Sequence, residues 1–114
     1  MGFIDVHNFE TRQNEANKIL LKYPGRIPII VEKSDKCDLP DISKKKYLVP
    51  KDLTMCQFIY TIRKRIELAP STSLFIMVNN HLVPSAKGLG VVYEDDKASD
   101  GFLYVVYTTE NTFG

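Results

Sequence analysis

Two short apolar runs constrain the fold of this chain most strongly. They cover residues 74–78 and 102–107 and are apolar at successive positions. Neighbouring side chains of a strand point to opposite faces of its sheet, so a strand of this kind has apolar groups to bury on both faces. The two runs therefore predict a sheet with helices on both sides.

The first of these helices is predicted over residues 9–22. Asn8 can cap its first turn, where Glu10 also complements the helix dipole. Apolar residues recur at helical spacing, at Phe9, Ala16, Ile19, Leu20 and Tyr23. Pro24 and Gly25 then end the helix, because proline lacks the backbone donor that a helix needs.

A second helix is predicted to begin after Thr54. Thr54 and Gln57 have the spacing of a capping box, in which each side chain bonds the other's backbone N–H. One face then carries Met55, Phe58, Ile59, Ile62 and Ile66 at helical spacing. The basic residues 63–65 fall toward the polar side and the C-terminal end, so we expect the apolar face to be core.

The remaining segments complete a strand and helix order. Residues 27–31 are predicted as a strand, with Pro28 near its start or on an edge, and residues 46–49 as an edge strand between lysines and Pro50. Residues 84–93 tolerate a helix that Gly88 and Gly90 interrupt, and an acidic run at 94–96 marks a solvated end.

This order fits an α+β fold of the ubiquitin-like β-grasp class. We expect a four-stranded mixed sheet crossed by the long helix, with an additional N-terminal helix on the opposite face. The chain is long enough for one core. We divide this single structural domain into an N-terminal helical extension (1–24) packed on the sheet, a ubiquitin-like core (25–109) and a flexible C-terminal tail (110–114).

Composition excludes several functions. Fifteen basic residues against fourteen acidic ones give no reason to expect nucleic acid as a partner, and no apolar run reaches the length of about 18 residues that a membrane-spanning helix needs. Two cysteines and two histidines lack metal-ligand spacing. Cys56 has no nearby histidine as a base, so we interpret it as a buried structural cysteine and His7 and His81 as surface residues. We expect no enzyme, metal or cofactor.

Four motifs occur in fixed order and spacing: Arg-Ile-Pro at 26–28, Lys-Tyr-Leu-Val-Pro at 46–50, Asp-Gly-Phe-Leu-Tyr at 100–104 and Glu-Asn-Thr-Phe-Gly at 110–114. With them the chain strongly resembles the autophagy ubiquitin-like modifiers of the light chain 3 and GABA-receptor-associated protein type. The resemblance runs from Phe9 to Gly114.

The resemblance implies that Gly114 is the lipid attachment site, joined by an amide bond to phosphatidylethanolamine. Ubiquitin-like activating and conjugating enzymes and a processing and deconjugating cysteine protease are the implied partners. Glycine suits the reaction because it has no side chain to obstruct a narrow channel. The sequence ends at this glycine, so it is either a processed form or a form that needs no processing. The implied location is cytoplasmic, and peripheral on autophagosomal membranes through the lipid.

The resemblance also implies docking of cargo receptors and adaptors through short motifs with an aromatic residue and, three positions on, an aliphatic one. Pocket 1, for the aromatic side chain, maps to Glu15, Ile19, Pro28, Ile30, Lys46, Leu48 and Phe102. Pocket 2, for the aliphatic side chain, maps to Tyr47, Val49, Pro50, Leu53, Phe58, Ile62 and Arg65. Thr61 lies beside pocket 2, where relatives usually place an apolar residue.

Three alternatives stay open. The basic residues 44–46 either keep an edge strand soluble or attract acidic residues beside a docking motif. Phe3, Ile4 and Val6 stand where relatives often carry lysines, and they either touch membrane or pack on the domain. The whole chain is either a lipid-conjugated modifier or an unconjugated trafficking adaptor that uses only its docking face.

Overall fold

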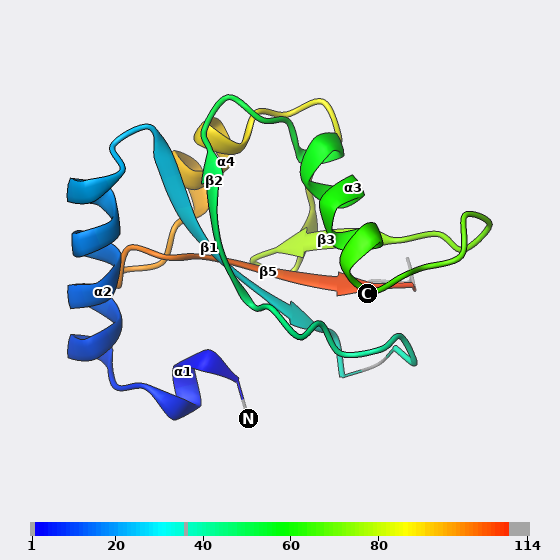
Figure 1. The fold of residues 1–114 in the computed structure, drawn as a ribbon, viewed down its shortest axis with the longest axis horizontal. Coiled ribbons are helices and arrows are strands. Elements are labelled where there is room, and N and C mark those ends of the chain that lie inside the picture. Colours follow the sequence, from blue (N-terminus) through cyan, green and yellow to red (C-terminus); the bar gives the residue numbers. More distant parts are fainter. Residues whose placement is uncertain (1, 36, 110–114) are drawn as a thin grey trace.

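The computed structural model describes residues 2–35 and 37–109, which form a mixed sheet between helices (Figure 1). The strand order is β2-β1-β5-β3-β4. The strands are β1 (Arg26–Lys33), β2 (Lys46–Pro50), β3 (Phe75–Val78), β4 (His81–Leu82) and β5 (Leu103–Thr108). The helices are α1 (Phe3–Val6), α2 (Phe9–Lys22), α3 (Met55–Arg65) and α4 (Leu89–Asp96).

Both predicted helix starts are confirmed by their caps. The side chain of Asn8 accepts a hydrogen bond from the Thr11 N–H at 2.8 Å, and α2 spans the predicted 9–22. At α3, the N–H of Gln57 donates to the Thr54 hydroxyl at 3.3 Å, and the N–H of Thr54 donates to the Gln57 side chain at 2.9 Å. The capping box satisfies donors that the first helical turn would otherwise leave unpaired.

β1 lies inside the sheet, antiparallel to β2 and parallel to β5. Pro28 is its third residue and stands opposite Leu48 of β2. Pairing with β5 begins one residue later, where Ile29 pairs with Leu103. Proline has no N–H to donate, but at position 28 no β5 residue is paired to accept one. This interior strand therefore tolerates the proline.

Two cores lie on opposite faces of the sheet. The larger core joins the sheet to α3 and α4. The smaller core, under α2, has Ala16, Ile30 and Phe102 fully buried at its centre. Figure 1 shows α2 and α3 on opposite sides of the strands. The prediction of helices on both faces is confirmed.

Gly101 lets α2 approach the start of β5. Its φ is +96°, in the region that residues with a side chain rarely adopt. A Cβ at this position would lie 2.9 Å from the Cβ of Ala16. The glycine is thus required twice, by backbone conformation and by the contact with α2.

The structure differs from the predicted architecture in several places. The ubiquitin-like α+β class is confirmed, but the sheet has five strands rather than four, because the two-residue β4 pairs with β3. The short α1 was not predicted either. β3 alternates between buried and half-buried residues, since the core under α2 contains no β3 residue. α4 also extends through the acidic run to Asp96.

Candidate functional site

The outer edge of β2 pairs with no other strand within residues 2–35 and 37–109. β2 is an end strand, and its pairs with β1 alternate between bonded and non-bonded residues. The bonds from Val31 N to Lys45 O and from Lys51 N to Gly25 O assign the bonded positions to the odd residues of β2. The N–H and C=O groups of Lys46 and Leu48 therefore point away from β1, toward an edge on which no other strand of the described part of the chain pairs.

Alternation along β2 also separates the two predicted pockets. Of the β2 residues assigned to the pockets, Lys46 and Leu48 point to the α2 face, and Tyr47 and Val49 point to the α3 face. Pro50 is also an even residue, so alternation does not group it with the other pocket 2 residues of β2. Pocket 1 and pocket 2 thus sit on opposite faces of the sheet, with the free edge of β2 between them.

The pocket 1 residues come together on the α2 face. Ile30 and Phe102 are 0% exposed, Pro28 is buried, Ile19 and Leu48 are half-buried, and Lys46 is exposed. The ammonium of Lys46 contacts both carboxylate oxygens of Glu15, so this ion pair joins β2 to α2. The floor of pocket 1 is therefore covered in this structure.

Phe3 of α1 provides part of this cover. Its ring lies 5.3 Å from that of Phe102, centre to centre, and the Lys46 ammonium lies 5.9 Å from the centre of the Phe3 ring. The N–H of Phe3 donates to Glu32 at 2.9 Å, which ties α1 to β1. Of the apolar N-terminal residues, Phe3 packs on the domain, whereas Ile4 is 51% and Val6 61% exposed.

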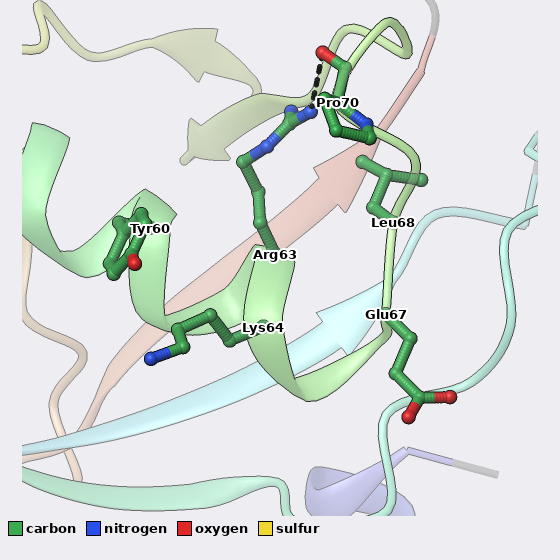
Figure 2. Close-up of a pocket in the computed structure, with 6 residues that line it drawn as sticks. All are labelled: Tyr60, Arg63, Lys64, Glu67, Leu68 and Pro70. Carbon is green, nitrogen blue, oxygen red and sulfur yellow. Dashed lines mark hydrogen bonds between the residues drawn. The ribbon is translucent and has the colours of Figure 1, made fainter.

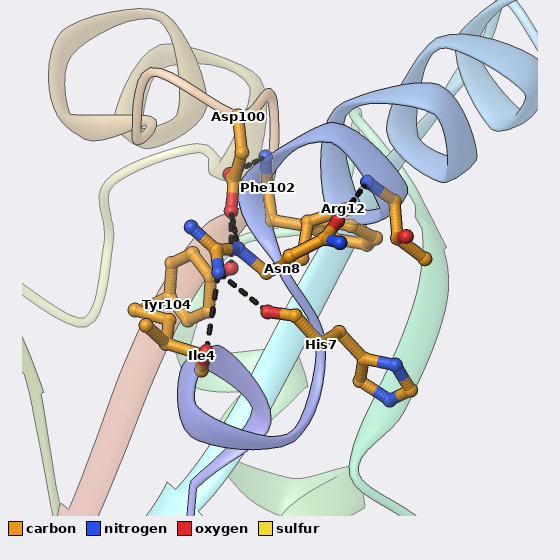
Figure 3. A network of polar contacts seen from close by, with 8 residues as sticks. Ile4, His7, Asn8, Arg12, Asp100, Phe102 and Tyr104 are labelled. Atoms are coloured by element: carbon orange, nitrogen blue, oxygen red, sulfur yellow. Dashed lines mark hydrogen bonds and ion pairs between the residues drawn. The ribbon is translucent and has the colours of Figure 1, made fainter.

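An ion pair between half-buried Arg12 and buried Asp100 holds α1 in this position (Figure 3). The Nε of Arg12 donates to Asp100 at 2.9 Å, and its Nη1 donates to the carbonyls of Ile4 at 3.2 Å and His7 at 2.7 Å. The carboxylate of Asp100 also accepts from the Tyr104 hydroxyl. Burial, followed by this bond to Asp100, raises the pKa of Tyr104.

The pocket 2 residues other than Pro50 come together on the α3 face. Phe58 and Ile62 are fully buried, Tyr47 and Val49 nearly so, Pro50 and Leu53 are half-buried, and Arg65 is exposed. The rings of Tyr47 and Phe58 meet edge to face with centres 5.7 Å apart. Most of pocket 2 is therefore also part of the larger core, and its rim is basic.

Two contacts at this site were missed from the sequence. One is the cover that Phe3 forms over Phe102. The other is a hydrogen bond from Nη1 of Arg26 to the Leu48 carbonyl at 2.9 Å, on the free edge of β2. Sequence alone does not predict the contact between Arg26 and Leu48. It depends on the register of β1 against β2, which only the structure gives.

A separate depression lies on the solvent side of α3 (Figure 2). Tyr60, Arg63, Lys64, Glu67, Leu68 and Pro70 line it. Nη2 of Arg63 donates to the carbonyls of Ala69, Pro70 and Thr72 at 3.1, 3.3 and 2.7 Å. Arg63 therefore fastens the loop after α3, and the depression contains none of the predicted pocket residues.

Other predicted residues have mixed outcomes. The interpretation of Cys56 as a buried cysteine is wrong, because its position in the first turn of α3 leaves it exposed. His7 and His81 lie at the surface, as predicted. Gly114 falls outside the described residues. Within residues 2–35 and 37–109, no helix is long and apolar enough to span a membrane.

Comparison with known proteins decides the family. The family model described as "Autophagy protein Atg8 ubiquitin like" matches residues 11–114. The chain belongs to the Atg8 family. It is 56% identical to Autophagy-related protein 8B of Oryza sativa subsp. indica over 108 residues, which cover 95% of this chain and 91% of the relative. It is 55% identical to Autophagy-related protein 8 of Mycosarcoma maydis over 113 residues, which cover 99% of this chain and 96% of the relative.

A solved Atg8 structure agrees with these matches. The crystal structure of Trypanosoma brucei ATG8 superimposes with a TM-score of 0.93 at 39% identity, covering 100% of this chain and 98% of that one. The resemblance inferred from the four motifs is thus confirmed, and so is the ubiquitin-like Atg8 fold. The chain is an autophagy-related, ubiquitin-like protein of the Atg8 family.

Proposed function

We propose that this Atg8-family chain is a modifier conjugated through Gly114 to phosphatidylethanolamine during autophagosome formation. Family membership and the Asn-Thr-Phe-Gly ending support this proposal. The activating enzyme uses ATP to adenylate the glycine carboxylate with release of pyrophosphate, and an enzyme cysteine then displaces AMP to form a thioester. The lipid amine displaces the thiol of the conjugating enzyme to form the amide, and a cysteine protease exposes the glycine beforehand or hydrolyses the amide later. The protein itself supplies the substrate carboxylate and no catalytic group. Its location is cytoplasmic before conjugation and peripheral on the autophagosomal membrane afterwards.

The same protein recruits cargo receptors by adding a peptide strand to β2. The observation that carries this part of the proposal is the empty edge of β2 between pockets on opposite faces. In an extended peptide, residues three apart point to opposite sides of the strand. An aromatic residue and an aliphatic residue three positions later can therefore enter pocket 1 and pocket 2 together, while Lys46 and Leu48 bond the peptide backbone.

Charge at the edge favours peptides with flanking acidic residues. Lys44, Lys45 and Lys46 precede or begin β2 and are exposed. Lys46 already contacts Glu15, which leaves Lys44 and Lys45 to attract an acidic flank. Such steering acts mainly on the association rate and weakens with salt. Reversing the charge with Lys45→Glu should slow association at low salt and change it little at high salt.

Reconstitution tests conjugation directly. Purified protein, activating and conjugating enzymes, ATP and liposomes containing phosphatidylethanolamine are combined, and the lipid adduct is detected by mass spectrometry. The expected product carries the lipid on Gly114, and deleting Gly114 abolishes it. Absence of product from the wild type would instead favour an unconjugated trafficking adaptor that uses only the docking face. Product after the deletion would rule out Gly114 as the attachment site.

A further inference from the structure

Phe3 makes the contacts that an aromatic guest of pocket 1 would need. Its ring lies 5.3 Å from that of Phe102 and 6.4 Å from that of Tyr104, centre to centre, and the Lys46 ammonium lies 5.9 Å from the centre of its ring. Phe102 and Lys46 are both assigned to pocket 1. An aromatic ring of the protein itself therefore competes with the aromatic side chain of a docking peptide.

The helix that carries Phe3 has little packing of its own. α1 is four residues long, none of them is buried, and Ile4 and Val6 are exposed. A helix of one turn is not stable in isolation, because a single turn does not repay the entropy of ordering its backbone. Its position therefore depends on bonds to other elements. One of them is the bond from the Phe3 N–H to the Glu32 carboxylate of β1 at 2.9 Å.

Arg12 of α2 supplies further bonds to this segment (Figure 3). Its Nη1 donates to the carbonyl of Ile4 in α1 and to that of His7 directly after it, while its Nε is paired with Asp100. The two carbonyl bonds are exposed, so water can replace them when α1 moves away. The Asp100 side chain is only 2% exposed. α1 can therefore detach while Arg12 stays paired with Asp100.

We propose that Arg12 is a positioning residue of pocket 1, which holds Phe3 there as an internal competitor that a docking peptide must displace. Binding then releases α1 from the domain. The apparent dissociation constant is the intrinsic one divided by the fraction of molecules in which α1 is already detached. This inference rests on the proposed docking function and adds how access to pocket 1 is controlled.

Arg12→Lys tests this role. Lysine keeps a positive charge beside Asp100, but its single nitrogen does not reproduce the fork that also reaches the two carbonyls. The variant should bind an aromatic-x-x-aliphatic peptide about two- to tenfold more tightly in calorimetry, whereas a merely structural role of Arg12 predicts weaker binding. Arg63→Lys is the matched control, because Arg63 also donates to backbone carbonyls, in the loop after α3. It should leave the affinity unchanged.

A double-mutant cycle shows whether Arg12 acts through Phe3. Phe3→Ala removes the competing ring, so adding Arg12→Lys to it should change the affinity by less than about twofold. Full additivity of the two gains would overturn the proposal. Glu32→Ala removes the bond to the Phe3 N–H and is the second variant, in case Arg12→Lys does not fold. It should also strengthen binding, and weaker binding by a folded Glu32→Ala would count against the proposal.

Amide hydrogen exchange measures the release of α1 in the wild type. The N–H of Phe3 bonds Glu32, and the N–H of His7 bonds the Phe3 carbonyl at 3.2 Å. A saturating peptide should speed exchange at both amides, because both bonds break or fray when α1 detaches. Unchanged or slower exchange with the peptide bound would overturn the release of α1 and leave the docking function standing. Failure of both the wild type and Phe3→Ala to bind the peptide would overturn the docking function, and this inference with it.

Discussion

Arg26 donates a hydrogen bond from Nη1 to the backbone carbonyl of Leu48 at 2.9 Å. That carbonyl lies on the free edge of β2, where an added peptide strand would need it as an acceptor. The protein thus covers part of the proposed docking edge with an exposed side chain. Covering of this kind is one way in which folded proteins protect an edge strand from unwanted pairing.

Removing this cover should strengthen binding of a neutral docking peptide. Arg26→Ala frees the Leu48 carbonyl without exposing a buried group, so the affinity should rise about two- to fivefold, within the range of one exposed hydrogen bond. Fluorescence anisotropy with an uncharged aromatic-x-x-aliphatic peptide measures the change. Lys18→Ala, at an exposed position of α2, serves as the control for losing one positive charge. A lower affinity after Arg26→Ala would show that the guanidinium binds the peptide.

Removing the ring of Phe3 should open pocket 1. Ile30 and Phe102 are fully buried while Phe3 lies on Phe102, so an incoming aromatic side chain must displace it. Phe3→Ala should therefore raise peptide affinity about three- to tenfold, because one competing aromatic contact of about 0.5–1.5 kcal/mol is lost. Val6→Ala, in the same helix but 61% exposed, is the control. Weaker binding by Phe3→Ala would identify Phe3 as a wall of the pocket.

Replacing Gly101 should destabilise the fold. Gly101→Ala adds a Cβ at a φ of +96° and 2.9 Å from the Cβ of Ala16. The backbone strain alone is worth about 1–3 kcal/mol, and the clash with α2 adds to it. Urea unfolding measures the loss. Gly25→Ala, where nothing lies within 4 Å of the added Cβ, should leave the free energy of unfolding nearly unchanged. Similar losses for the two variants would contradict this role of Gly101.

The free energy of unfolding should fall in strong alkali, because buried tyrosines keep their protons at a pH at which the unfolded chain loses them. Burial raises the pKa of Tyr107 to about 12 from its ordinary value of 10.0. Between these values the unfolded chain loses the proton and the folded protein keeps it, so the free energy of unfolding decreases by about 1.4 kcal/mol per pH unit for this group. Below pH 10 Tyr107 is protonated in both the folded and the unfolded state, so this group causes no loss of stability there.

Tyr107→Phe tests this pH dependence. Urea unfolding of the variant between pH 10 and 12 should show a shallower decline than the wild type, although Tyr47, Tyr93 and Tyr104, whose pKa values are also raised, still contribute. At pH 8 the variant should be less stable, because the Tyr107 hydroxyl donates to the Pro40 carbonyl at 2.6 Å. Tyr60→Phe is the exposed control. Parallel slopes for Tyr107→Phe and the wild type would contradict the assignment.

Local sequence signals were sufficient for the starts of α2 and α3 and for most strands. Asn8, Thr54 and Gln57 act through neighbours within one helical turn, so the starts of α2 and α3 could be predicted from spacing alone. α1 and β4 could not, because segments of four and two residues are too short to show a period. Their positions depend on distant partners, such as Glu32 for Phe3 and Met77 for Leu82.

The family resemblance named the candidate site residues, but it could not show which contacts cover them in the fold. Family resemblance assigned residues to the two pockets, and the alternation of β2 divides those of that strand between two faces. The contacts that cover the site depend on tertiary packing: Phe3 on Phe102, Arg26 on Leu48 and Lys46 on Glu15. A sequence pattern does not specify such contacts, since each joins segments that are more than ten residues apart.

Amide hydrogen exchange along β2 tests the docking mode most directly. The N–H groups of Lys46 and Leu48 point away from β1, whereas those of Tyr47 and Val49 are paired with it. Adding a saturating aromatic-x-x-aliphatic peptide should slow exchange at Lys46 and Leu48 by at least tenfold and leave Tyr47 and Val49 little changed. Peptide binding without new protection of Lys46 and Leu48 would contradict strand addition at this edge.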